Sequence, residues 1–216
     1  MDKKVKIFDI EIDKYTKKQA VKKLIEFVES DGLNIVDFIN MDTLSKGQEI
    51  PELRDAVKVF DMVLPGDAAV LQAMGADEEE SPLTEFFQYM RKRHKKVFVV
   101  AQTEESLAIC LSQIREQHAL PVAGGAILPS EIEQEEGLIN EINAAVPDCV
   151  LAAVPSPLQE AFIIRNYTTM NTRMWIGCTG PVEPEHQGQS FGRIRHFFKW
   201  KLFQHKVEKE KQISNT

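Results

Sequence analysis

The sequence predicts an α/β fold, in which a mainly parallel sheet is covered by helices on both faces and a basic helical appendage follows at the C-terminus. Strand-length apolar runs recur along the chain, and amphipathic segments of roughly 10 to 17 residues separate them. A length of 216 residues is enough to bury a sizeable core. Strands that alternate with such helices are typical of parallel sheets with right-handed crossovers.

The N-terminal half contains two clear signals. Val5–Ile12 alternates apolar and polar residues, which predicts a single strand. Thr16 is the expected N-cap of a helix whose apolar residues recur at helical spacing up to Val28. The other elements expected here are a strand over 34–40, a short helix, a small strand over 62–64 and an amphipathic helix from Pro82.

The C-terminal half is more regular, with apolar strands separated by helices. Gly124-Gly125 predicts a turn after Val122. In order, the expected elements are a strand at Lys96–Ala101, helices at Thr103–His118 and Pro129–Ala145, a strand at Cys149–Val154, a helix at Pro157–Met170 and a strand at Met174–Cys178.

Charge is distributed unevenly along the chain, whose net charge is −7. Residues 191–216 contain seven Lys or Arg and two Glu, a net charge of +5, which leaves −12 for residues 1–190. We therefore expect an α/β domain over residues 1–187 and a basic amphipathic tail over residues 188–216. An acidic domain disfavours nucleic-acid binding, and the sequence leaves homo-oligomerisation open.

The sequence also bears on location. It has no run of about 18 apolar residues, so no membrane-spanning helix is expected. The N-terminal residues lack the apolar core and cleavage site of a signal peptide, which predicts a cytoplasmic protein. Cys110, Cys149 and Cys178 lie in apolar runs without metal-ligand spacing, and their odd number argues against a disulfide framework. We expect buried, unreactive thiols.

Polar residues follow two strands at the points where they end. Asn40 and Asp42 end the strand at 34–40, and Asp67 follows the strand at 62–64. Ligands of open α/β proteins bind at the carboxyl ends of strands, so Asp67 fits a general base and the other two fit ligand binding. The structural alternative is that Asp67 and Asp42 cap the helices that follow them, and spacing alone favours that alternative.

Two further loops are expected at the same edge. Ser156 and Gln159 begin a helix whose first-turn amides favour an anionic group, with the Gln159 amide at the mouth of the site. The same two residues fit a capping box, and both interpretations can hold together. Gly180 lies in a small-residue segment that would let a nucleotide approach, or that simply makes a turn. No phosphate-binding motif or metal-ligand spacing is present, so no cofactor or metal is expected.

The tail mixes aromatic and basic residues. In one interpretation it lies on an anionic membrane, with aromatic rings at the level of the lipid headgroups. In the other it is a helix docked on the domain, whose basic face offsets the acidic body. Its apolar residues fall on more than one helical face, which favours the membrane. The residues expected to touch lipid are Arg193, Arg195, Lys199, Trp200 and Lys201.

Five pieces of the sequence, in order, resemble the WecB/TagA/CpsF family of bacterial glycosyltransferases over roughly residues 5–180. They are the strand end Ile39–Leu44, the run from Pro51-Glu52-Leu53-Arg54 to Leu64-Pro65-Gly66-Asp67, the strand–loop–helix at 96–114, Pro157-Leu158-Gln159-Glu160 and Ile176-Gly177-Cys178-Thr179-Gly180.

The resemblance implies a peripheral enzyme of cell-surface polysaccharide synthesis. Such an enzyme moves a sugar, typically an N-acetylated aminosugar, from a UDP donor to a polyprenyl-diphosphate-linked sugar at the cytoplasmic membrane face. The resemblance further implies inversion at the anomeric carbon without a metal. The resemblance would make Asp67 the base and place Asn40 and Asp42 beside the acceptor. Gln159 would contact the donor or the acceptor, and the tail would complete the site.

The sequence departs from the family pattern at the candidate base. The family's Pro-Asp-Gly appears as Pro65-Gly66-Asp67, which moves the carboxylate by one residue, about 3.8 Å along the chain. Leu158 replaces a Lys, and the family's Gly-Gly-Ala-Phe-Asp is reduced to residues 179–183. These departures support an alternative, a non-catalytic relative that binds sugar nucleotides or regulates the same pathway. A third interpretation, an interaction module, would depend on the tail alone.

Overall fold

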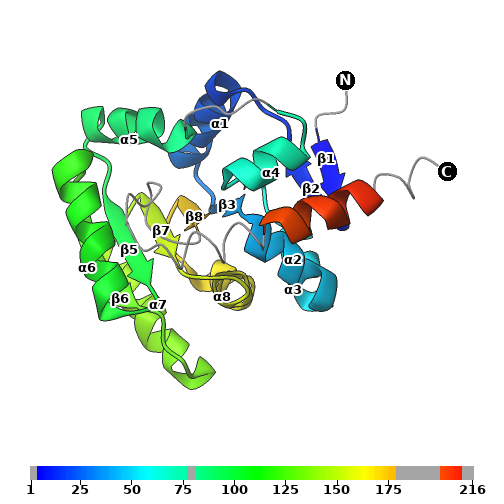
Figure 1. The fold of residues 1–216 in the computed structure, drawn as a ribbon. Helices are drawn as coiled ribbons and strands as arrows, with labels where there is room; N and C mark the ends of the chain where they lie inside the picture. Colours follow the sequence, from blue (N-terminus) through cyan, green and yellow to red (C-terminus); the bar gives the residue numbers. More distant parts are fainter. Residues whose placement is uncertain (1–3, 77–80, 179–199, 211–216) are drawn as a thin grey trace.

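The computed structural model describes residues 4–76, 81–178 and 200–210, and its centre is a six-stranded parallel sheet (Figure 1). The strand order is β4-β3-β8-β7-β5-β6, and every neighbouring pair is parallel. The predicted parallel α/β architecture is therefore confirmed. The strands are β3 (Asn34–Ile39), β4 (Met62–Pro65), β5 (Val97–Ala101), β6 (Val122–Ile127), β7 (Cys149–Ala153) and β8 (Met174–Cys178).

Helices cover both faces of the sheet, as predicted, because each strand presents apolar side chains on both sides (Figure 1). One face packs against α1 (Lys17–Glu29), α5 (Pro82–Lys92) and α6 (Glu104–Ser112). The other packs against α3 (Pro51–Lys58), α7 (Glu135–Ala145) and α8 (Leu158–Asn166). Two short helices, α2 (Met41–Glu49) and α4 (Ala68–Ala73), begin directly after β3 and β4.

The first predicted strand is wrong in one respect, because residues 5–12 form a hairpin rather than one strand. The antiparallel strands β1 (Lys4–Ile7) and β2 (Ile10–Asp13) pair with Ile7 opposite Ile10. The two-residue turn, Phe8-Asp9, has φ values of 50° and 63°, the left-handed region that two-residue hairpins favour. The sequence carries a signal for this turn, since the apolar positions change from odd to even numbers at Phe8.

The predicted glycine turn is also wrong, because Gly124 and Gly125 lie inside strand β6. A Cβ atom on Gly124 would lie 2.6 Å from the Phe98 ring of β5, and one on Gly125 would lie 3.0 Å from Leu107 of α6. The glycines therefore make room for large neighbours in the core, which is a second common use of glycine in a strand.

Several helices begin or end differently from the prediction. Thr16 caps α1 as predicted, within a capping box, and Thr103 forms a second capping box at α6. The helix predicted to end at His118 changes to π-helical geometry over Gln113–Gln117. Short 3₁₀ segments precede α7 at Ile132–Gln134 and follow α8 at Tyr167–Thr169, so both α-helices are shorter than predicted.

The C-terminal helix, residues 200–210, docks on the domain. Phe203 and Val207 are 2% exposed in the core, and the Phe203 and Phe8 rings meet edge to face at 5.8 Å. The Gln204 amide donates to the Ala69 carbonyl at 3.2 Å, and the Phe8 amide donates to the Glu210 carboxylate at 3.0 Å. For these residues the structure has the docked helix that was the alternative to a membrane-bound tail.

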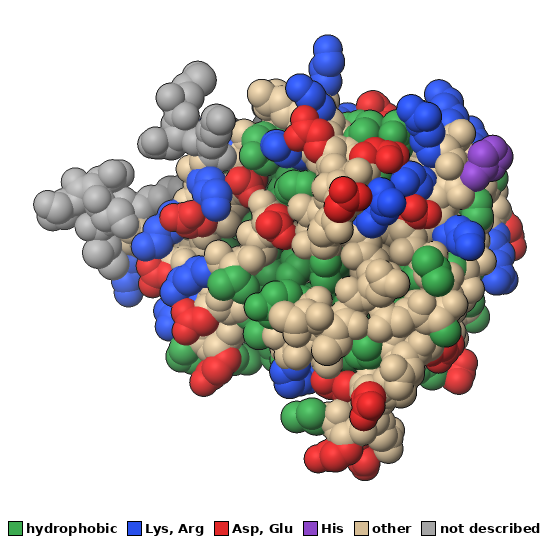
Figure 2. Space-filling model, turned by 180° about the vertical axis from the view of Figure 1, so that it is seen from behind, with side chains coloured by type: hydrophobic (Ala, Val, Ile, Leu, Met, Phe, Trp, Pro, Cys, Tyr) green, Lys and Arg blue, Asp and Glu red, His purple; other side chains and the backbone are tan. Residues whose placement is uncertain are grey.

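All three cysteines are free and buried, as predicted, and burial raises the pKa of Cys110 and Cys149. Among the described residues, the helices are too short or too polar to span a lipid bilayer. The face opposite to Figure 1 intersperses acidic and basic side chains, so it presents no large field of one sign (Figure 2).

Candidate functional site

Three loops meet at the carboxyl edge of the sheet, after β3, β4 and β7. The Met41 amide after β3 donates to Asp67 Oδ2 after β4 at 2.9 Å. The Thr43 hydroxyl, in the first turn of α2, lies 2.8 Å from the Ser156 hydroxyl after β7. The two contacts join residues 26 and 113 positions apart in the sequence, which is the convergence that the strand ends predicted.

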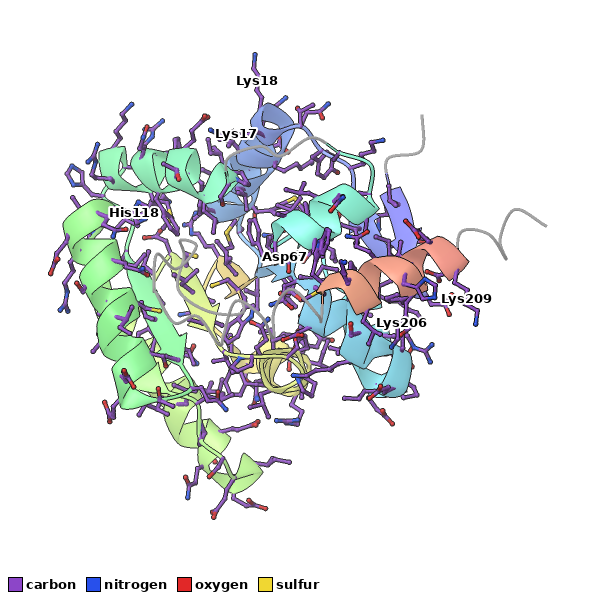
Figure 3. The ribbon with its side chains drawn as sticks, viewed as in Figure 1. Lys17, Lys18, Asp67, His118, Lys206 and Lys209 are labelled. Atoms are coloured by element: carbon purple, nitrogen blue, oxygen red, sulfur yellow. The ribbon has the colours of Figure 1, made fainter. Side chains whose placement is uncertain are left out.

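Asp67 caps α4, which was its structural alternative. Its carboxylate accepts hydrogen bonds from the Val70 amide at 2.8 Å and from the Met41 amide at 2.9 Å, one on each oxygen. An ionised carboxylate has about four lone-pair sites, so each oxygen can accept a further hydrogen bond. The side chain is half-buried and lies centrally at the start of α4, beside the C-terminal helix that carries Lys206 and Lys209 (Figure 3).

Gly66 explains why the carboxylate follows the glycine in this chain. The Gly66 amide donates to the Ile39 carbonyl at 2.6 Å, so the turn after β4 lies against the end of β3. A Cβ atom at position 66 would lie 2.6 Å from the Phe38 carbonyl oxygen. This position therefore has no space for a side chain, and the carboxylate is supplied by the next residue.

Asn40, and not Asp42, caps α2. The Asn40 side-chain oxygen accepts from the Thr43 amide at 2.9 Å and lies 3.1 Å from the Thr43 hydroxyl oxygen. Asp42 lies in the first turn of α2 and is exposed. The predicted capping role of Asp42 is therefore wrong, because the residue two positions earlier already bonds the first-turn amide.

Ser156 and Gln159 do not form the predicted capping box, because the cap position of α8 is Pro157 and no side chain caps the helix. The Ser156 hydroxyl instead donates to the Glu160 carboxylate and meets Thr43. The Ser156 carbonyl accepts from Lys46 Nζ at 2.5 Å, which ties the loop before α8 to α2 a second time.

Gln159 points into the protein rather than toward the mouth of the edge. Its side chain is 2% exposed, and its amide nitrogen lies 3.1 Å from Asp37 Oδ1 and 3.4 Å from Glu160 Oε1. A Cβ atom on Gly177 would lie 2.7 Å from the Gln159 oxygen, so that glycine makes room for the amide. A direct contact between Gln159 and a substrate would require this side chain to leave its buried position.

Sequence reasoning did not single out Asp37 and Glu160, two buried carboxyl groups joined by Gln159. Burial, with the neighbouring Glu160, raises the pKa of Asp37 well above its usual range. Burial also raises the pKa of Glu160, against the opposing effect of its hydrogen bond from Ser156. A signal was available, because Asp37 is the one charged residue in the apolar strand Asn34–Ile39.

Several predicted site residues lie outside the described residues, namely Gly180, Arg193, Arg195 and Lys199. Of the predicted membrane contacts, Trp200 is half-buried against the core and Lys201 is exposed. Within residues 4–76, 81–178 and 200–210, no three His, Cys, Asp or Glu side chains cluster in a way that could hold a metal ion.

Comparison with known proteins agrees with this architecture. No curated protein matches the chain. The model of the glycosyl transferase WecG/TagA/CpsF family matches residues 5–183, which include the sheet and all three loops of the carboxyl edge. Because that match covers most of the 216 residues, the chain belongs to the glycosyl transferase WecG/TagA/CpsF family.

Proposed function

We propose that this protein transfers a sugar, of the N-acetylated aminosugar type, from a UDP donor to a polyprenyl-diphosphate-linked sugar, with inversion at the anomeric carbon. Asp67 would accept the proton of the acceptor hydroxyl as that oxygen attacks the anomeric carbon and UDP leaves. The observation that carries this proposal is the position of Asp67, half-buried at the carboxyl edge where the loops after β3, β4 and β7 meet. Family membership supports sugar transfer as the reaction class.

Hydrogen bonds from Val70 and Met41 fix the orientation of the Asp67 carboxylate before a substrate arrives. A base whose geometry is set in advance loses little freedom in the transition state. Asn40 and Asp42, on the adjoining turn, would contact the acceptor sugar. Ser156 and Gln159 are both buried, so they would act from the α8 side by holding the edge in place rather than by touching the substrate, and Gly180 would line the donor side.

The basic tail would hold the enzyme on the inner face of the cell membrane, where a lipid-linked acceptor is found. The packing of residues 200–210 supports this, because the docked face leaves Lys201, Leu202 and Lys209 exposed on the other side. Docking and the proposed membrane contact would use different faces of one helix.

The test of the base is Asp67→Asn, with Asp61→Asn as a matched control. The Asp61 carboxylate, at the opposite end of β4, accepts a hydrogen bond from the Ile35 amide at 2.8 Å. Both substitutions therefore remove a carboxylate that accepts a backbone amide in or directly after β3. Sugar transfer should fall about 10²–10⁴-fold in Asp67→Asn and stay within about twofold of wild type in Asp61→Asn. Equal rates in the two variants would remove Asp67 from the mechanism.

One observation favours the non-catalytic alternative: both Asp67 oxygens already accept hydrogen bonds from backbone amides. A panel of UDP-sugars separates the two functions. A bound sugar nucleotide at 100 times its Kd should raise the melting temperature by about 5–10 °C. Stabilisation with UDP release and sugar transfer supports the enzyme, whereas stabilisation without turnover supports a binding or regulatory partner.

A further inference from the structure

A continuous chain of polar contacts runs from the core to the candidate base. At its inner end the Gln159 amide bridges two carboxyl groups, and at its outer end two hydroxyl groups meet between α8 and α2. Because the one Ser156 proton goes to Glu160, the Thr43 hydroxyl donates to Ser156. The Thr43 amide donates to Asn40 at 2.9 Å, and Asn40 directly precedes Met41, whose amide holds Asp67. In order, the contacts join Asp37, Gln159, Glu160, Ser156, Thr43 and Asn40.

The inner end is held tightly and is dry. Asp37, Gln159 and Glu160 are each at most 2% exposed, and the space beside them, lined also by Phe60 and Trp175, has no room for a water molecule. Among the described residues, three acceptor oxygens there find no donor, namely Asp37 Oδ2, Gln159 Oε1 and Glu160 Oε2. Two buried carboxylates without a cation between them are unfavourable, so a proton held by the pair supplies a missing donor.

The outer end determines the geometry of the site. The Ser156 hydroxyl donates a hydrogen bond to Glu160, and the Ser156 carbonyl accepts one from Lys46. Ser156 therefore has little freedom to move. Ser156 in turn fixes Thr43 by accepting its hydroxyl proton, and the Thr43 amide donates to the Asn40 side chain. The next amide along the chain, that of Met41, bonds Asp67.

We propose that Glu160 is a positioning residue, which acts through Ser156 and Thr43 to hold the Asn40–Met41 turn where it orients the Asp67 carboxylate. This inference rests on the proposed role of Asp67 as the base. It also gives a reason for a buried polar group at this point, since an apolar core of the same volume would serve stability equally well. Such a chain fixes one arrangement of the α2 and α8 helix starts.

The test uses Thr43→Val, which replaces the hydroxyl with a methyl group of similar size, and Thr43→Ser, which keeps the hydroxyl. We expect Thr43→Val to lower kcat about tenfold with KM within twofold of wild type, while Thr43→Ser stays within about twofold for both. Hydrogen exchange of the Met41 amide should be faster in Thr43→Val and unchanged in Thr43→Ser. Ser156→Ala breaks the same link from the α8 side and should reproduce both effects. If Thr43→Val does not fold, Ser156→Ala carries the test.

Two results separate the inference from the function on which it rests. Wild-type kcat and Met41 exchange in both Thr43→Val and Ser156→Ala, beside lost turnover in Asp67→Asn, would overturn the positioning role and leave the base in place. Unchanged turnover in Asp67→Asn would overturn the proposed base itself. The double variant Thr43→Val/Ser156→Ala should be no slower than the slower single variant, and strictly additive losses would contradict a single shared link.

Discussion

At the scale of the single residue, Gly66 sets how closely the turn after β4 approaches β3. Its missing side chain lets the Gly66 amide reach the Ile39 carbonyl at 2.6 Å. The carboxylate at position 67 then meets the Met41 amide, so the glycine and the aspartate act together. In this chain, close backbone packing therefore requires glycine at position 66, and the carboxylate stands at position 67.

Gly66→Ala should destabilise the protein, because the added Cβ would lie 2.6 Å from the Phe38 carbonyl oxygen. Overpacking of this kind costs about 1–3 kcal/mol, which denaturant unfolding would measure. Gly32→Ala is the control, since a Cβ there meets nothing within 4 Å and should change stability by less than about 0.5 kcal/mol. Equal unfolding free energies for the two variants would refute the steric explanation.

Asp37 gives the protein a pH dependence whose sign can be stated. Its raised pKa means that the folded state keeps a proton that the unfolded chain releases above pH of about 4, so stability falls as pH rises toward the native pKa. Glu160, the other ionisable group that lines this space, acts in the same direction. Each pH unit in that window removes about 1.4 kcal/mol for the proton that the pair holds.

Asp37→Asn should remove the contribution of that residue, because an amide stays neutral over this pH range. The unfolding free energy of wild type should therefore fall relative to the variant as pH increases above about 4. Asp55→Asn serves as the control, since Lys58 lowers the pKa of the exposed Asp55 and no such fall is expected. Parallel pH curves for wild type and Asp37→Asn would show that Asp37 is not the proton holder.

At the scale of the secondary-structure element, the C-terminal helix has two different faces. Phe203 and Val207, four residues apart, pack into the core, and Gln204 bonds the α4 backbone at Ala69. The helix thereby supports the element that Asp67 caps. Removing the whole tail would therefore disturb the domain as well as any membrane contact.

Phe203→Ala should lower the unfolding free energy by about 3–5 kcal/mol, as expected when a buried aromatic ring is removed. The neighbouring Leu202 is 62% exposed, so Leu202→Ala should change the unfolding free energy by less than about 0.5 kcal/mol. Thermal or denaturant unfolding of the two variants measures the difference. A small effect of Phe203→Ala would mean that the helix does not dock in solution.

At the scale of the whole molecule, an acidic body carries a basic end. Substituting individual tail cations tests membrane binding without removing the docked helix. Each Lys or Arg near an anionic surface contributes about 1 kcal/mol, so replacing Arg193, Arg195 and Lys199 together by Gln should weaken binding to anionic vesicles about 10²-fold. Co-sedimentation at low salt would measure this change.

The control replaces three exposed lysines outside the tail, Lys14, Lys18 and Lys22, the last two of them on α1. This control variant loses the same three positive charges as the tail variant. If the tail contacts the membrane, the control should keep its vesicle affinity within about threefold of wild type. Equal losses in the two triple variants would point to a general charge effect, and no loss in either would place membrane contact elsewhere.

The sequence by itself determined the parallel sheet, its helical layers and most helix starts, because apolar periodicity and capping residues are local signals. It also predicted that the strand ends would converge. Only the tertiary structure decided that Gly124 lies within a strand and that Gln159 turns inward, because neighbours distant in sequence, Phe98 and Asp37, occupy the space beside them. A side chain's direction depends on which partner it finds across the fold, and that information is not local.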